Sequence, residues 1–288
     1  MPNQNYITEM LELKDNNVIF KENYYYKENI KEITYKIFEG YLIYKPKCCY
    51  KCGVIFDDKL EKYGFINSDI KSPEVSFYKT ILRLHKQRYL CKHCGKAFTL
   101  STSITNYGCF ISNNTKHKIA KDLIKKRSEK DIALDNNVSP NTVKRIMDSY
   151  YETQKIYKHS LPEVLSFDEF KSVKTADGAM SFHMCNGITG QTIDIIEDRC
   201  LDNLIKTSII MTIKLEVMLN LSLLICILHI FLIKNTFNNN YYNGYIEGNN
   251  NFIKVIKRIA FGFRSFKRFK ARIMICKGLI KIKKIASA

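Results

Sequence analysis

Two short cysteine motifs constrain the fold of this chain more than any other feature of the sequence. They read "CYKCG" at 49–53 and "CKHCG" at 91–95, and in each the two cysteines are separated by two residues. This spacing lets four thiolates surround one zinc ion tetrahedrally, with a glycine easing the turn after each pair. Cys48 offers an alternative register without that spacing, and four unrelated buried cysteines are the other alternative. We expect a structural zinc site, closed to water, with the ligands Cys49, Cys52, Cys91 and Cys94.

The composition favours a basic protein of a reducing compartment. The formal net charge of +18 over 288 residues is typical of chains that bind nucleic acid or an anionic membrane surface. From Gly248 to Ala288 there are twelve positive residues and no acidic one, although a solvated helix face would give the same pattern. The N-terminus lacks the pattern of a secretory signal. We therefore expect a cytoplasmic, nucleoid-associated location, where ten cysteines favour metal ligation or free thiols over disulfides.

The stretch "RSEKDIALDNNVSPNTVKRIMDSYY" at 127–151 predicts two short helices joined by a tight turn. Ser128 and Asp131 form a capping box, while Ser139 caps a second helix that begins with Pro140. This is the helix-turn-helix plan, in which the second helix enters the major groove of DNA; a plain helical hairpin is the alternative. The residues predicted to pack inward are Val143, Ile146 and Met147. Those predicted to face DNA are Ser139, Asn141, Thr142, Lys144 and Arg145.

Downstream of Leu161 the pattern changes to short runs rich in β-formers. "VLSFDEF", "AMSFHMCNGI" and "TIDIIEDR" are separated by Asp-Gly and Thr-Gly turn signals, which predicts three consecutive antiparallel strands. Asp168 lies in the first of these runs. The final block, "NGYIEGNNNFIKVIKRIAFGFRSFKRFKARI", predicts an amphipathic helix with a basic face, interrupted at "FGF".

Between these blocks lies a hydrophobic segment at 207–237 that matches nothing around it. Its stretch Val217–Ile233 has seventeen residues without a formal charge, which is at the lower edge of what spans a bilayer. A membrane span would place Asn220, Ser222 and His229 in lipid. We expect no membrane partner.

Taken together, these blocks resemble the insertion-sequence transposases of the L-three type, the ISL-three family. The resemblance is carried by "CYKCG" with "RYLCKHCGKAF", by "DIALDNNVSPNTV", by "LSFDEFKSVKTADGAMSFHMCNGITGQTIDIIEDR" and by "YYNGYIEGNNNFIKVIKRIAFGFRSFKRFKARI". It implies a DDE transposase with a ribonuclease-H-like domain, in which two aspartates and a glutamate hold two Mg²⁺ ions that drive DNA cleavage and strand transfer. Asp168 matches the first aspartate and Glu247 the closing glutamate. Hard oxygen ligands suit Mg²⁺, and the resemblance gives both carboxylates this role.

This chain departs from the family pattern at the second aspartate. In the family that residue lies in a run like "IDMYSPYI", but between Asp202 and Glu247 the chain has a single acid, Glu216, in a different context. Codons chosen from those allowed for residues 207–232 can encode the missing run when they are translated in a shifted reading frame. Our hypothesis is that 207–237 is an out-of-frame translation followed by a deletion, which leaves an inactive or crippled copy. The nucleotide sequence of the gene tests it.

The sequence therefore predicts a multidomain α/β (α+β) chain with a zinc ribbon, a helix-turn-helix and an incomplete ribonuclease-H-like domain. We expect Zn²⁺ as structural cofactor, Mg²⁺ in the intact family, and as partners transposon-end and target DNA and further copies of the chain in a synaptic complex. The basic helix adds the predicted DNA contacts Lys254, Lys257, Arg258 and Arg264. The alternative function is a non-catalytic DNA-binding protein or repressor. The expected parts are a preamble at 1–40, the zinc ribbon at 41–110, the helix-turn-helix at 111–155, the catalytic domain's first part at 161–206, the hydrophobic segment at 207–237 and the catalytic domain's C-terminal part at 238–288.

Overall fold

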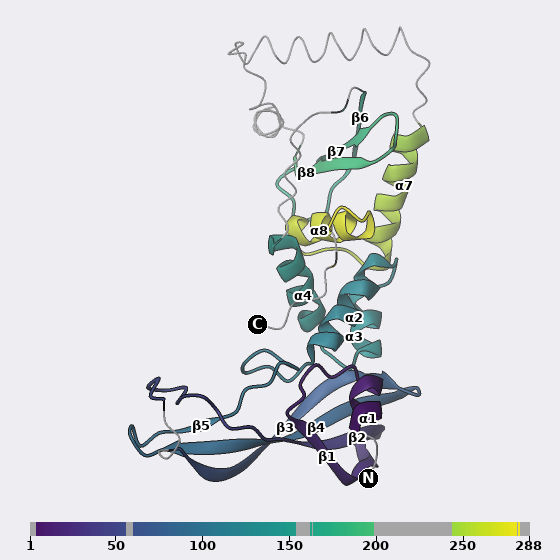
Figure 1. Cartoon of the computed structure of the whole chain (residues 1–288). Helices are drawn as coiled ribbons and strands as arrows, with labels where there is room; N and C mark the ends of the chain where they lie inside the picture. Colours follow the sequence, from purple (N-terminus) through teal and green to yellow (C-terminus); the bar gives the residue numbers. More distant parts are fainter. Residues whose placement is uncertain are drawn as a thin grey trace, which may run out of the picture. The chain divides into compact units, whose positions relative to one another are not determined.

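The computed structural model describes residues 4–55, 60–153, 162, 164–198, 244–280 and 282, and it has the mixed α and β content that the sequence predicts. The chain divides into two compact units. Of the described residues, those within 1–122 and 130–143, together with residue 282, belong to unit 1, and those within 123–129 and 144–281 belong to unit 2. Each unit has its own sheet, β1–β5 in unit 1 and β6–β8 in unit 2 (Figure 1).

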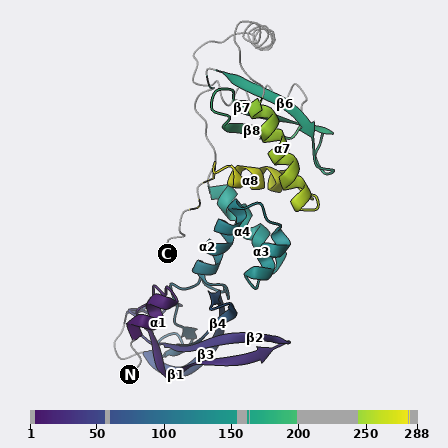
Figure 2. The ribbon, with the colours of Figure 1, turned by 90° about the vertical axis from the view of Figure 1, so that its right-hand side faces the viewer.

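Unit 1 is built on a five-stranded sheet with strand order β1-β2-β4-β3, in which the short β5 pairs with β4. All neighbours are antiparallel except β2 and β4, which run parallel. The strands are β1 (Val18–Ile30), β2 (Ile33–Leu42), β3 (Leu60–Val75), β4 (Tyr78–Cys91) and β5 (Ala97–Thr99). Helix α1 (Gln4–Met10) lies beside this sheet (Figure 2), and its Ile7 packs into the main core with Leu82 and Leu84 of β4.

The region expected to be a preamble, 1–40, contains α1, β1 and most of β2. The sequence conceals β1 because its pairing with β2 shifts register between Phe20 and Tyr25. Such an irregularity changes which side chains face the core, so alternation of polar and apolar residues is not sustained along the strand.

Three helices follow the sheet of unit 1: α2 (Asn113–Ile124), α3 (Glu129–Asp135) and α4 (Pro140–Thr153). The bounds of α3 and α4 agree with the predicted caps, since α3 begins one residue after Ser128 and α4 begins at Pro140. The residues predicted to pack inward from α4 are all buried: Val143, Ile146 and Met147.

Unit 2 contains the three predicted antiparallel strands, in the order β6-β7-β8 (Figure 1). Helix α7 packs against β6 and β7. The predicted break at "FGF" is present between α7 and α8, where Phe261 and Gly262 both have positive φ. The elements are β6 (Leu165–Lys171), β7 (Met180–Asn186), β8 (Thr192–Ile196), α7 (Gly244–Ile259) and α8 (Phe266–Cys276).

The hydrophobic segment at 207–237, and with it the hypothesis of a shifted frame, lies outside the described residues. Among the helices that are described, none combines the length and apolar character needed to cross a membrane.

Candidate functional site

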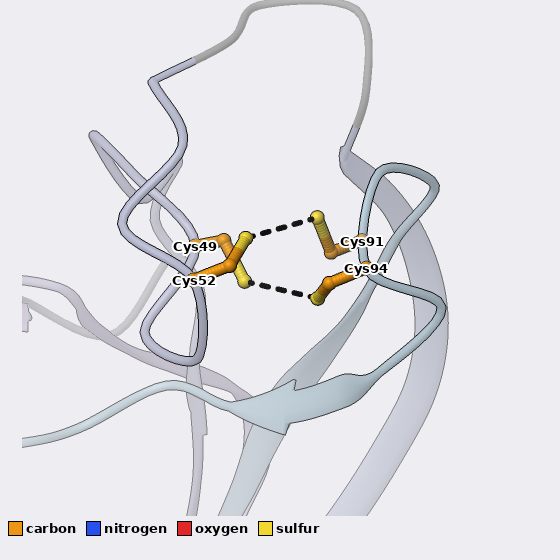
Figure 3. Close-up of side chains that lie close together, drawn as sticks. All are labelled: Cys49, Cys52, Cys91 and Cys94. Carbon is orange, nitrogen blue, oxygen red and sulfur yellow. Dashed lines mark hydrogen bonds between the residues drawn. The ribbon is translucent and has the colours of Figure 1, made fainter.

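The four predicted zinc ligands lie together (Figure 3), with all four sulfurs within 4.8 Å of one another. The Sγ atoms of Cys49 and Cys94 are 3.9 Å apart, and those of Cys52 and Cys91 are also 3.9 Å apart. Four sulfurs bound tetrahedrally to zinc at about 2.3 Å lie about 3.8 Å from one another. The spacing and the thiolate donor set therefore fit zinc.

The two halves of the cluster have the same backbone geometry. The N–H of Gly53 donates to the carbonyl of Cys49 at 2.8 Å, and that of Gly95 donates to the carbonyl of Cys91 at 2.8 Å. Both glycines have positive φ, +73° and +67°, a conformation that strains any residue with a Cβ. The glycine after each cysteine pair is thus needed to close the turn that points both thiols at one centre.

The structure also resolves the question of ligand register. Cys49 belongs to the group of four, whereas Cys48 lies outside it. Burial would raise the pKa of the Cys49 thiol, but donation from the N–H groups of Lys51 and Cys52, with the thiols of Cys52 and Cys91, lowers it to about 7. For the Cys52 thiol the backbone hydrogen bond to Val54 lowers the pKa, but burial and the thiols of Cys49, Cys94 and Cys91 raise it to about 12.

The N-terminus of α4 is capped as predicted. The hydroxyl of Ser139 accepts a hydrogen bond from the N–H of Thr142 at 3.2 Å, and it lies 3.0 Å from the Thr142 hydroxyl. Among the residues predicted to face DNA, Ser139, Asn141 and Arg145 are exposed. Lys144 is half-buried and lies 3.9 Å from the carboxylate of Glu129. Thr142 is only 8% exposed, so on this helix the surface offered to a ligand is carried by its neighbours.

The turn between α3 and α4 is held by the sheet of unit 1. Asn137 has a positive φ of 53°, and its side-chain oxygen accepts a hydrogen bond from the hydroxyl of Tyr35 at 3.3 Å. The Nζ of Lys71 donates to the carbonyl of Asn137 at 2.7 Å. Burial lowers the pKa of Lys71, with a contribution from the nearby charge of Lys79. Sequence reasoning missed both supporting residues, because nothing local distinguishes them.

In unit 2 the structure brings the two predicted catalytic acids to neighbouring elements. Asp168 is exposed on β6, and its Oδ2 accepts a hydrogen bond of 2.7 Å from the side-chain amide of Asn250 on α7. Glu247 is exposed one helical turn before Asn250. The Asn250 contact thus holds the first part of α7 against the strand that carries Asp168. Sequence reasoning missed Asn250, although its spacing of three from Glu247 places both on one side of the helix.

Buried polar side chains support this junction. His183 on β7 is fully buried, and its Nε2 lies 3.2 Å from the hydroxyl of Thr192 on β8. Burial, with the nearby charge of Lys277, lowers the pKa of His183 to about 4, so the ring is neutral at physiological pH. Asn249 on α7 donates to the carbonyl of Gly190 at 2.9 Å. Within the described residues, however, the cysteine cluster is the sole group of three or more acidic, histidine or cysteine ligands placed to hold a metal.

The four predicted basic contacts on and after α7 have different environments. Lys254, Arg258 and Arg264 are exposed. Lys257 is half-buried, and its Nζ donates to the carbonyls of Lys171 at 2.9 Å and Ser172 at 2.6 Å, at the end of β6. Its pKa is lowered by burial and by the charge of Lys171.

Helix α8 is joined to the helical part of unit 2 by two arginines. Arg268 forms an ion pair with Asp148 at 2.9 Å, and the guanidinium of the buried Arg272 donates to the carbonyls of Lys125 at 3.1 Å and Arg127 at 2.6 Å. These carbonyls follow the C-terminus of α2. Arg272 therefore connects α8 to the segment that directly follows α2, where the carbonyl of Lys125 also accepts from the N–H of Arg127 at 2.9 Å.

Comparison with known proteins gives one relative and two family matches. Over 46 residues the chain is 59% identical to an "ATP-dependent protease" of Lactococcus lactis subsp. lactis, and the match covers 16% of this chain and 15% of that protein. Residues 100–151 match the helix-turn-helix domain of transposase family ISL3, which spans α2 to most of α4. Residues 226–273 match the DDE transposase model of the same family, which includes Glu247 and most of α8. These two matches in separate parts of the chain support its assignment to the ISL3-type transposases.

Proposed function

We propose that this chain is a transposase-derived protein that binds the DNA of insertion-sequence ends and carries an incomplete DDE catalytic site. One observation carries the DNA-binding part of the proposal. The family match over 100–151 coincides with α2 to α4, and α4 exposes Asn141 and Arg145 on the side opposite its buried residues. Exposed polar and basic residues on the second helix of such a motif are the groups that contact bases and phosphates.

DNA binding is tested by replacing Arg145. We expect Arg145→Ala to weaken binding of the full chain to duplexes taken from the DNA flanking its gene by at least about fivefold, since a lost arginine contact costs about 1–3 kcal/mol. Fluorescence anisotropy with labelled duplexes gives the affinities. The matched control is Lys130→Ala, an exposed basic residue on α3, which we expect to have a much smaller effect. Equal effects of the two substitutions would contradict the assignment of α4 as the recognition helix.

For catalysis, Asp168 and Glu247 are the residues that would hold magnesium. The ions would supply an activated hydroxyl and neutralise charge on the scissile phosphate. The chain's own contribution is positional: Asn250 fixes one carboxylate oxygen of Asp168, and the N–H of Glu169 donates to the other at 2.7 Å. With Glu216 as the one acid between Asp202 and Glu247, the sequence offers no match to the family's second aspartate.

We therefore expect no strand transfer by this chain. Two carboxylates would hold a pair of Mg²⁺ ions poorly, because one of the three carboxylates that the family uses has no match in this chain. The measurement is a strand-transfer reaction with the purified chain, Mg²⁺ and the element's own ends. Joined DNA products would contradict the expectation, and the codons of 207–232 independently test the shifted frame.

The lack of a match to the second aspartate also favours a second function, that of a repressor without catalysis. Such a protein would occupy the element's ends and exclude a full-length transposase. Transposition of an intact relative should then fall when this chain is co-expressed, and it should recover with the Arg145→Ala variant.

A further inference from the structure

We propose that unit 1 carries a second DNA-contact surface where the β1–β2 and β3–β4 hairpins meet. This hairpin patch consists of Lys27, Lys36, Phe77 and Tyr78. The assignment of this patch rests on the proposed function, because it assumes that the ligand is DNA. The patch is a site separate from α4.

The tip of the β3–β4 hairpin carries an aromatic side chain that contributes nothing to the core. Val75 pairs with Tyr78, so Ser76 and Phe77 form a two-residue turn, with φ of 50° and 64°. This turn geometry strongly prefers asparagine, aspartate or glycine, and a bulky residue at positive φ is strained. Phe77 is 100% exposed, so burial does not offset that strain. Strained residues of this kind occur preferentially where a ligand is bound.

Two lysines lie directly opposite each other beside this turn. Lys27 on β1 pairs with Lys36 on β2, and like charges at facing positions of an antiparallel pair destabilise the sheet. Both ammonium groups lie over the ring of Tyr78, at 4.5 Å and 5.1 Å, and Lys27 donates to the Tyr78 hydroxyl at 3.3 Å. In the described part of the chain neither lysine has a carboxylate partner. The sheet thus holds two uncompensated cations close together.

A ligand that fits this arrangement has closely spaced negative charges beside flat apolar groups. DNA supplies both, since phosphates attract paired lysines and bases stack on exposed aromatic rings. Apolar side chains on strand tips are also inserted between base steps by proteins that kink DNA. We assign the lysines of the patch to phosphates and Phe77 to bases.

The experiment compares full-chain variants on two fluorescein-labelled probes, a duplex of the gene's flanking DNA and the same duplex with a four-base mismatch bubble. The double variant K27Q/K36Q should lose two phosphate contacts. The slope of log K against log salt concentration should therefore fall in magnitude by about 2 on both probes. Phe77→Ala should weaken binding to the bubble probe by at least about fivefold, and the plain duplex less, because unpaired bases are free to stack. Zinc content and melting temperature verify that each variant is folded.

Two matched controls come from the same unit. Lys21 also lies over a tyrosine ring, Tyr41, at 4.3 Å, and Tyr107 is 95% exposed. We expect Lys21→Gln and Tyr107→Ala to leave the salt slope and the bubble preference unchanged.

Three outcomes would overturn the proposal. If Arg145→Ala weakens binding and the patch variants match the controls, the patch is refuted while the proposed function stands. If Phe77→Ala changes the sedimentation of the free chain and not its DNA affinity, the patch is a protein contact. If the wild-type chain binds neither probe, the patch and the proposed function fail together.

Discussion

We expect the replacement of Cys49 or Cys91 by serine to abolish metal binding at the four-cysteine cluster and to unfold the sheet of unit 1. Both thiols are fully buried, and a serine hydroxyl does not replace a thiolate as a zinc ligand. Structural zinc contributes about 10–16 kcal/mol in zinc-finger peptides, which is as large as the whole stability of a typical domain, about 5–15 kcal/mol. Loss of the ion should therefore decide whether the unit folds. Metal analysis of the purified protein should fall from one zinc per chain to none, and circular dichroism should lose strand signal.

The neighbouring cysteine provides the control. Cys48 is adjacent in sequence and lies outside the cluster, so Cys48→Ser should retain zinc and fold normally. A chelator added to the wild-type chain should reproduce the unfolding seen for Cys49→Ser. Normal folding of the chelated chain would show that the cluster does not stabilise the unit.

A comparably clear loss of stability is expected in unit 2 from Phe269→Ala. Phe269 on α8 is fully buried, and its ring lies 6.1 Å from that of Phe170 on β6 and 5.1 Å from that of Phe263. Truncating a buried phenylalanine costs about 3–5 kcal/mol through lost transfer energy and a residual cavity. Since Phe170 follows Asp168 on the same strand, the contact also joins α8 to the strand that carries Asp168. Urea denaturation followed by circular dichroism gives the change in unfolding free energy.

Phe261 is the matched control for this substitution. It lies between α7 and α8 and is 95% exposed, so Phe261→Ala should change stability by no more than about 0.5 kcal/mol. A similar loss for both variants would mean that the cost arises in the unfolded state and not from packing in unit 2.

The parts of the site that the sequence predicted are those fixed by local chemistry. The cysteine spacing determines which thiols converge, because a turn of a few residues sets the geometry of each pair. The start of α4 follows from Ser139 and Pro140, since a cap and a missing N–H act within one turn of the helix. The three strands of unit 2 follow from short β-forming runs with turn residues between them.

What the sequence did not predict depends on contacts between distant residues. Strand β1 was hidden by its irregular register, and only the fold shows that Tyr35 and Lys71 support Asn137. Likewise, the contact of Asn250 with Asp168 joins positions 82 residues apart, and no local pattern encodes it. The burial of Thr142 has the same origin, because the helical period alone does not define where the packed face ends.

The parallel pairing of β2 with β4 has a consequence for the folding of this protein during translation. Strand β2 ends at Leu42 and β4 begins at Tyr78. The backbone groups of β2 that pair with β4 therefore stay unpaired while the intervening residues are synthesised. At about 5–20 residues per second this lasts a few seconds, during which the edge is open to other chains. The second cysteine pair follows at the end of β4, so zinc can close the unit only after that wait. We therefore expect the yield of folded chains to depend on the metal that is present while the chain is being translated.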